Sequence, residues 1–102
     1  MTSRENIIYA NKIGYHVSET GQVFDNNGKL LHSHVNKRKR RAFKIDIDGR
    51  LTYIEVCRLQ GYQLFGKDTF KEGYGVTHSN GNFMDDSSGN IIIIKLIVSI
   101  LS

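Results

Sequence analysis

The chain lacks the usual means of bracing a small protein covalently or anchoring it in a membrane. It has one cysteine, Cys57, and no proline. A single cysteine excludes an internal disulfide and any zinc ribbon built from the cysteines of one chain, and it fits a reducing compartment. The longest apolar run, residues 91–94, is too short to span a bilayer, and the polar first residues lack the apolar segment of a signal peptide. We therefore expect a cytoplasmic protein without a membrane partner.

The length of 102 residues suits one small domain over residues 1–102, and the apolar pattern predicts hairpins at its start. Residues 14–31 contain short alternating stretches separated by Gly21 and the turn Asn27-Gly28, which predicts two short strands joined by turns. Residues 41–56 alternate on both sides of Asp48-Gly49, the turn sequence of a second hairpin. We expect one face of that hairpin to be polar.

A helix and a last pair of strands complete the predicted fold. Residues 54–66 have helical spacing and stop at Gly66, while Gly61 lowers the helix propensity and predicts close packing. Residues 74–78 predict a short strand that runs into a turn, and the β-branched residues 91–94 predict another. The expected fold class is α+β, with small antiparallel hairpins and one helix.

The net charge of +4 conceals a concentrated basic segment. Seven of the 14 Lys and Arg residues lie between Lys29 and Lys44 with no acidic residue among them, so this stretch carries +7 and the rest of the chain −3. Such a segment releases counterions from a phosphate backbone, which favours a nucleic-acid partner. A solvated loop that keeps the protein soluble is the alternative. The candidate nucleic-acid-binding residues are Lys37, Arg38, Lys39, Arg40, Arg41 and Lys44.

A histidine stands at the end of the strand predicted over residues 74–78. His78 is followed by an Asn-Gly-Asn turn and then by the isoleucines of the last strand. This order is that of a ββα-metal nuclease finger, in which the histidine deprotonates water and one Mg²⁺ or Mn²⁺ stabilises the phosphorane. A lone histidine beside a turn is otherwise a surface residue.

Three ordered blocks extend this pattern along the chain. They are GYHVSETGQVFDNNGKLL, TYIEVCRLQGYQLFG and GVTHSNGNFMDDSSGNIIII. Together they resemble the phage-type HNH homing endonucleases over roughly residues 12–96. The resemblance implies an N-terminal β module over about residues 12–50, which lays its basic sheet against DNA. Over about residues 51–102 it implies a helix and an incomplete ββα-metal (HNH-like) finger.

The resemblance also implies roles for residues of the finger. His78 matches the general base, and Thr77 stands where an acidic ligand of the divalent cation is expected. Asp85 and Asp86 do not stand at the family's ligand positions, but they could bind the cation from the turn. A simple pair of turn residues is the alternative. The implied turn and structural residues are Gly81, Asn82 and Asn90.

Three departures from the family pattern leave the activity open. Thr77 replaces the usual aspartate, Cys57 replaces the histidine of the opening helix, and the chain ends about where the last helix of the finger would begin. We interpret Cys57 as a small buried apolar residue. Metal-dependent DNA nicking by His78 and DNA binding without cleavage are two alternatives.

A third alternative places the protein in a different class. A phage-derived protein could have kept the scaffold in order to bind and inhibit a host nuclease or defence protein. The β-branched end of the chain could also pair with a second copy in a homodimer.

Overall fold

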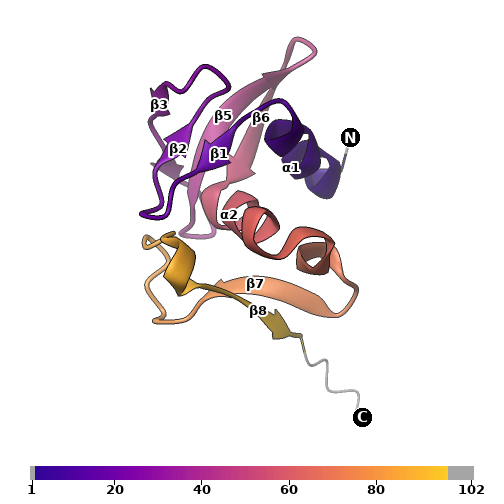
Figure 1. The fold of residues 1–102 in the computed structure, drawn as a ribbon, viewed down its shortest axis with the longest axis vertical. Coiled ribbons are helices and arrows are strands. Elements are labelled where there is room, and N and C mark those ends of the chain that lie inside the picture. Colours follow the sequence, from indigo (N-terminus) through magenta and orange to yellow (C-terminus); the bar gives the residue numbers. More distant parts are fainter. Residues whose placement is uncertain (1, 97–102) are drawn as a thin grey trace.

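The computed structural model describes residues 2–96 and has a helix, α2, at its centre (Figure 1). Helix α1 and two small antiparallel sheets, β1-β2-β3 and β4-β5-β6, lie on one side of α2, and the hairpin β7–β8 lies on the other. The elements are α1 (Ser3–Lys12), β1 (His16–Val17), β2 (Val23–Phe24), β3 (Leu30–Leu31), β4 (His34–Val35), β5 (Arg41–Ile47), β6 (Arg50–Glu55), α2 (Val56–Phe65), the 3₁₀ turns η1 (Gly66–Phe70) and η2 (Ser88–Asn90), β7 (Tyr74–His78) and β8 (Ile91–Lys95). The predicted α+β class is confirmed.

The hairpin β5–β6 separates the core from an outer, solvated face. Phe43 pairs with Ile54 on the core face, whereas Lys44 pairs with Tyr53 on the outer face. Alternate residues of a strand point to opposite faces, so Phe43 is buried and Lys44 is exposed. Asp48 has a φ of 53°, which together with the glycine that follows makes the tight turn that the sequence predicted.

Helix α1 was not predicted from the sequence. Its first turn is closed by a capping box, in which the Glu5 backbone N donates to Thr2 Oγ1 at 3.2 Å and the Thr2 backbone N donates to Glu5 Oε1 at 2.8 Å. Ile7 and Ala10 lie on one face of α1 and are buried against the core. The signal was therefore present as Thr-x-x-Glu before an apolar stripe.

Helix α2 confirms the helix predicted over residues 54–66, and its glycine brings β7 close. A Cβ on Gly61 would lie 2.8 Å from Cγ2 of Val76, so only glycine allows this approach. The predicted close packing at Gly61 is confirmed. Because Val76 is two residues before His78 on β7, the contact brings the end of β7 against the first turns of α2.

The remaining elements agree with the sequence except at two short strands. Strand β4, which pairs with β5 through His34–Ala42 and Val35–Arg41, was not predicted. The two strands expected over residues 14–31 are three, because β3 pairs with β2 through Val23–Leu31 and Phe24–Leu30. β7 and β8 confirm the last two predicted strands. The position where the family resemblance expects the last helix of the finger to begin lies in residues 97–102, outside the described residues. No helix over residues 2–96 is long and apolar enough to cross a bilayer.

Candidate functional site

His78 and Asp86 form a buried pair. The His78 side chain, at the end of β7, is 0% exposed, and the Asp86 side chain, in the loop before β8, is 1% exposed. Nε2 of His78 lies 2.7 Å from Oδ1 of Asp86. Since an ionised carboxylate can only accept, Nε2 carries the hydrogen of this bond. The bond satisfies one of the two oxygens of a carboxylate that is out of contact with water.

Arg41 satisfies the other oxygen of Asp86. Its Nη1 donates to Oδ2 of Asp86 at 3.0 Å and to the backbone O of Gly21 at 2.8 Å, and its Nε donates to Oγ of Ser33 at 3.0 Å. The Arg41 side chain is only 22% exposed. A residue that was predicted to contact nucleic acid is therefore half-buried and paired, and it joins β5 to the loop before β8.

Gln60 of α2 fixes the backbone of the same loop. Its Nε2 donates to the backbone O of Asp86 at 3.0 Å and to that of Ser18 at 2.8 Å. The Ser88 backbone N donates to the Glu19 backbone O at 2.8 Å. The carboxylate of Asp86 is thus positioned from β5, from α2 and from the turn after β1.

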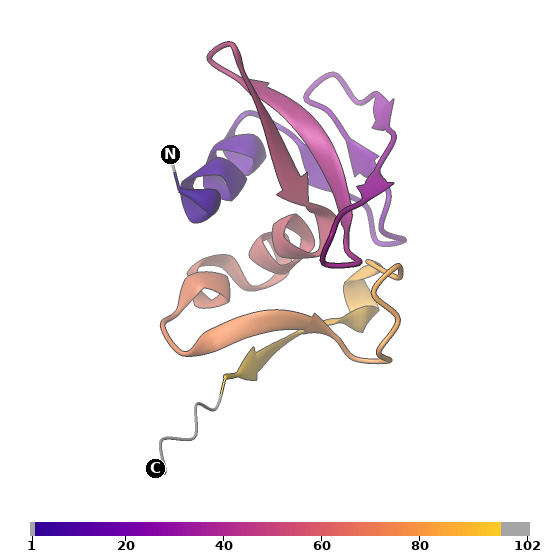
Figure 2. The same ribbon diagram turned by 180° about the vertical axis from the view of Figure 1, so that it is seen from behind.

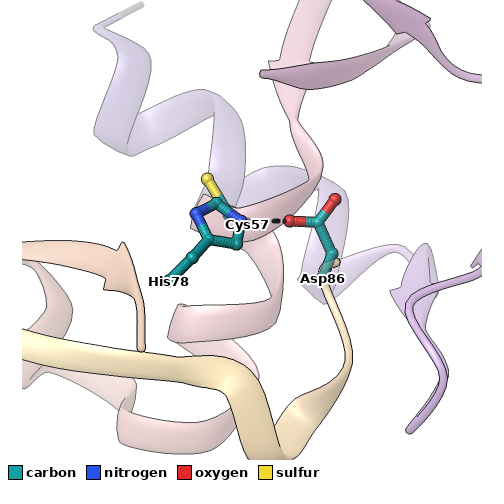
Figure 3. A group of neighbouring side chains, drawn as sticks. All are labelled: Cys57, His78 and Asp86. Atoms are coloured by element: carbon teal, nitrogen blue, oxygen red, sulfur yellow. Dashed lines mark hydrogen bonds and ion pairs between the residues drawn. The ribbon is translucent and has the colours of Figure 1, made fainter. Parts of the chain in front are cut away.

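Cys57, in the first turn of α2, lies beside this pair. Its Sγ, a ring nitrogen of His78 and a carboxylate oxygen of Asp86 all lie within 4.8 Å of one another. Figure 3 shows the three side chains side by side. Burial and the nearby Asp86 carboxylate raise the pKa of the Cys57 thiol from 9.0 to about 12. The thiol is therefore protonated at neutral pH and is not a reactive nucleophile. Its predicted burial is confirmed.

The second ring nitrogen of His78 has no partner. Among the buried side-chain nitrogen and oxygen atoms of residues 2–96, Nδ1 of His78 is the one that makes no hydrogen bond. Phe83 covers part of the ring, with the two ring centroids 5.6 Å apart. Buried polar atoms of this kind are rare and usually mark a functional constraint or a ligand.

The structure does not gather the predicted ligands of a hard divalent cation. Thr77 pairs with Ile92 and, as the strand neighbour of His78, points to the opposite face of β7. The Asp85 carboxylate accepts from the backbone N and Oγ of Ser87, which holds the pKa of Asp85 below its ordinary value. Both oxygens of Asp86 are engaged by His78 and Arg41. Mg²⁺ demands an octahedral set of oxygens, and these three residues do not fit it.

The predicted turn and structural residues lie together in the loop between β7 and β8. Asn90 Oδ1 accepts from the backbone N of Asn80 at 3.0 Å, and its Nδ2 donates to the backbone O of Asp85 at 2.8 Å. Gly81 has a φ of 75°. Asn82 Oδ1 accepts a hydrogen bond from the backbone N of Met84 at 3.0 Å. The buried Asn90 therefore ties the two ends of the loop together.

The remaining basic candidates lie at the surface. Lys37, Arg38 and Lys39 are exposed in the turn between β4 and β5, and Lys44 is exposed on the outer face of β5. This turn approaches the loop after β7 (Figure 2), where the guanidinium of Arg40 lies over the ring of Phe83 at 3.8 Å. Four of the six predicted cations are thus free of buried contacts.

A cleft of about 630 Å³ opens beside the basic turn. Its cations are Lys37, Arg38 and Arg58, and its carboxylate, that of Glu55, already accepts from Asn36 and lies 3.6 Å from Arg38. Two aromatic rings, His34 and Tyr53, line the same cleft and meet edge to face at 5.2 Å. The combination of cations and aromatic rings suits a phosphate-bearing, base-bearing partner.

Comparison with known proteins gives one informative likeness. A scan against protein families and a search of curated proteins found no match. A solved structure that describes DNA binding and cleavage by the HNH homing endonuclease I-HmuI is similar, with a TM-score of 0.60 and 27% sequence identity. The alignment covers 79% of this chain and 46% of that one, so this chain spans about half of its length. The fold is therefore HNH-like.

The sequence did not single out Cys57 or Arg41 for the places they take. Cys57 stands where the family resemblance expects a histidine, but nothing in the neighbouring sequence places it beside His78 and Asp86. Arg41 carried no signal, because it is one of five consecutive cations. Its partner Asp86 is 45 residues away in the chain.

Proposed function

We propose that this protein is a DNA-binding domain of the HNH-endonuclease type. It binds duplex DNA, and His78 does not act as a general base that cleaves it. The observation that carries the proposal is the similarity of its fold to a structure of DNA binding and cleavage. The basic segment of the sequence supplies the charge that such binding needs.

The binding surface in this proposal consists of the basic turn and the outer face of β5 and β6. Lys37, Lys39 and Lys44 are exposed there, and none of them is tied to an acidic side chain. Tyr53 stands opposite Lys44 on the same face. Flexible lysines on a sheet beside an exposed aromatic ring can follow a phosphate backbone, which positions DNA without reading its sequence.

The absence of cleavage in this proposal follows from the position of His78. A general base must reach the proton that it removes, directly or through one water. The side chain of His78 is 0% exposed and its Nε2 is held by Asp86. The oxygen ligands of Mg²⁺ or Mn²⁺ do not come together at Thr77, Asp85 and Asp86, so no step is assigned to that ion.

The binding half is tested by the salt dependence of DNA affinity. Fluorescence anisotropy with a labelled duplex would compare the wild type with a triple variant, Lys37→Gln, Lys39→Gln and Lys44→Gln. The slope of log K against log salt is negative, and each lost phosphate contact reduces its magnitude by about 0.9. The magnitude should therefore be smaller in the triple variant by up to about 2.7. The matched control replaces the exposed lysines Lys12, Lys67 and Lys95, which removes the same charge elsewhere.

Equal losses of DNA affinity in the two triple variants would mean that only net charge matters. No DNA binding by the wild type at low salt would overturn the proposal.

The absence of cleavage is tested with supercoiled plasmid in the presence of Mg²⁺, Mn²⁺ or EDTA, for the wild type and for His78→Ala. We expect intact plasmid throughout. Metal-dependent nicking that disappears in His78→Ala would restore the nickase alternative.

A further inference from the structure

Three buried side chains converge at a point that the proposed DNA surface does not use. Cys57 comes from the first turn of α2, His78 from the end of β7, and Asp86 from the loop that follows (Figure 3). One potential ligand atom of each lies within 4.8 Å of the others, and all three residues are buried. A thiolate, an imidazole and a carboxylate are the ligands that proteins use for zinc.

We propose that Cys57, His78 and Asp86 form a buried binding site for a zinc-type transition-metal ion. Sulfur and imidazole ligands select such ions over Mg²⁺, which takes oxygen alone. The site is therefore different in chemistry and in residues from the hard-cation site expected at Thr77, Asp85 and Asp86. It shares only Asp86 with that set.

The distances need only small changes for an ion to fit. Zinc bonds of about 2.0–2.3 Å in a tetrahedron separate the ligand atoms by about 3.2–3.8 Å. The widest separation, 4.8 Å, must then close by about 1 Å, and the 2.7 Å between Nε2 of His78 and Oδ1 of Asp86 must widen by about 0.5 Å. Arg41 can stay on Oδ2 of Asp86, because the ion needs only Oδ1.

The unpartnered ring nitrogen of His78 is the second observation that points to a ligand. In a neutral histidine one ring nitrogen donates and the other accepts or binds a metal, and the partners of the two nitrogens fix the tautomer. Here the bond to Asp86 alone holds the ring proton on Nε2, and Nδ1 makes no hydrogen bond. When the ion takes Nε2, the ring proton is carried on Nδ1 instead and the imidazole stays neutral.

The protons and charges then balance with one proton released for each ion bound. The thiol of Cys57 loses its proton to solvent, and its sulfur gives a lone pair to the ion. The carboxylate of Asp86 is already paired with Arg41 and His78. The two negative charges of thiolate and carboxylate balance the two positive charges of the ion.

The site is tested first by optical titration of the full, reduced chain with Co²⁺, which replaces Zn²⁺ in tetrahedral sites and absorbs when a thiolate binds it. Because the chain has one cysteine, any thiolate-to-cobalt band reports Cys57. We expect the band to saturate at one ion per chain, to release one proton, and to disappear when Zn²⁺ is added. No band from the folded wild type would overturn the proposal.

Three variants separate this site from adventitious binding. Cys57→Ala and His78→Gln each remove a ligand, whereas His34→Gln removes an exposed histidine as the control. Zn²⁺ should raise the Tm of the wild type and of His34→Gln, and its affinity should fall about tenfold or more in the other two. An unchanged Zn²⁺ effect in Cys57→Ala would overturn the proposal. Cys57→Ala decides the matter if His78→Gln fails to fold, since it replaces a small buried residue by another. The readouts involve no DNA, so failure of the proposed DNA binding would leave them intact.

Discussion

Two groups of cations that are neighbours in the sequence end in different surroundings. Lys37, Arg38 and Lys39 are exposed in the turn between β4 and β5, whereas Arg41, two residues further, is half-buried and paired with Asp86. Arg38 is paired as well, with Glu55, but at 3.6 Å and with 66% of its side chain exposed. The guanidinium of Arg38 therefore makes a contact that solvent screens, whereas that of Arg41 makes a contact with a buried carboxylate.

The difference shows that a run of basic residues has two separate physical uses. Exposed pairs contribute about 0–1 kcal/mol, because water and salt screen them and two flexible side chains must be ordered. A buried carboxylate with one partner removed leaves an uncompensated charge, which costs about 3–5 kcal/mol. The exposed cations remain available to a phosphate backbone, and Arg41 instead joins β5 to Gly21 and to the loop before β8.

The largest effect that we predict is on the buried pairs. Asp86→Ala leaves Arg41 and His78 without their carboxylate, and it should lower the free energy of unfolding by about 3–5 kcal/mol. Urea denaturation followed by circular dichroism, with EDTA present, measures it. The control is Asp85→Ala, which removes the neighbouring carboxylate and should lower the free energy of unfolding much less. Equal losses in the two variants would contradict the comparison between enclosed and exposed charges.

A smaller loss is expected from Asn90, which is polar and uncharged but equally buried. Asn90→Ala removes the acceptor of the Asn80 backbone N and the donor to the Asp85 backbone O, which leaves unsatisfied groups in the loop. We expect a loss of about 2–3 kcal/mol in the free energy of unfolding. Asn82→Ala, in the exposed part of the same loop, should lose about 1 kcal/mol. Faster hydrogen exchange at the backbone of residues 79–90 in Asn90→Ala alone would complete the measurement.

The sequence predicted the elements whose patterns are local. β5 and β6 followed from strict alternation around Asp48-Gly49, and α2 followed from its spacing and its stop at Gly66. Strand β3 was missed because two residues give no alternation to count. Helix α1 was missed although Thr2 and Glu5 form a capping box, because only a short apolar stripe follows them.

The site could be predicted only in part, because its contacts join distant segments. His78 was found from the strand and turn around it, and Asp86 was found as one of a pair of turn aspartates. Asp86 is buried, unlike Asp85, because Arg41 and Gln60 bind it. These two residues are 45 and 26 residues away from Asp86 in the chain. No local pattern distinguishes two adjacent aspartates in that respect. The same reason hid Arg41 among the surface cations.

Alkaline pH should weaken the protein through Cys57. Burial raises the pKa of this thiol to about 12, whereas an unfolded chain ionises it near 9.0. Above the lower value the unfolded state loses the proton first, so the thiol's contribution to stability falls as pH rises toward the higher one. The expected slope is about 1.4 kcal/mol per pH unit. The difference in urea midpoint between wild type and Cys57→Ala, measured with EDTA across this range, isolates the thiol from lysines and tyrosines. A constant difference would mean that Cys57 is accessible to water in the native state.

The smallest expected effect on stability is that of replacing Arg38, the exposed arginine of the two ion pairs compared. Arg38→Ala removes an ion pair to Glu55 whose arginine is 66% exposed, and it should change the free energy of unfolding by about 0.5 kcal/mol or less. The matched change is Arg41→Ala, which leaves Asp86 with one partner and should cost about 3 kcal/mol or more. On DNA affinity the order should reverse when both proteins are assayed well below their melting temperatures, because Arg38 is largely exposed and its pair with Glu55 is the longer of the two, whereas Arg41 is held by Asp86. A loss of DNA affinity in folded Arg41→Ala larger than that in Arg38→Ala would mean that the enclosed arginine leaves Asp86 to bind DNA. The separation between structural and binding cations would then fail.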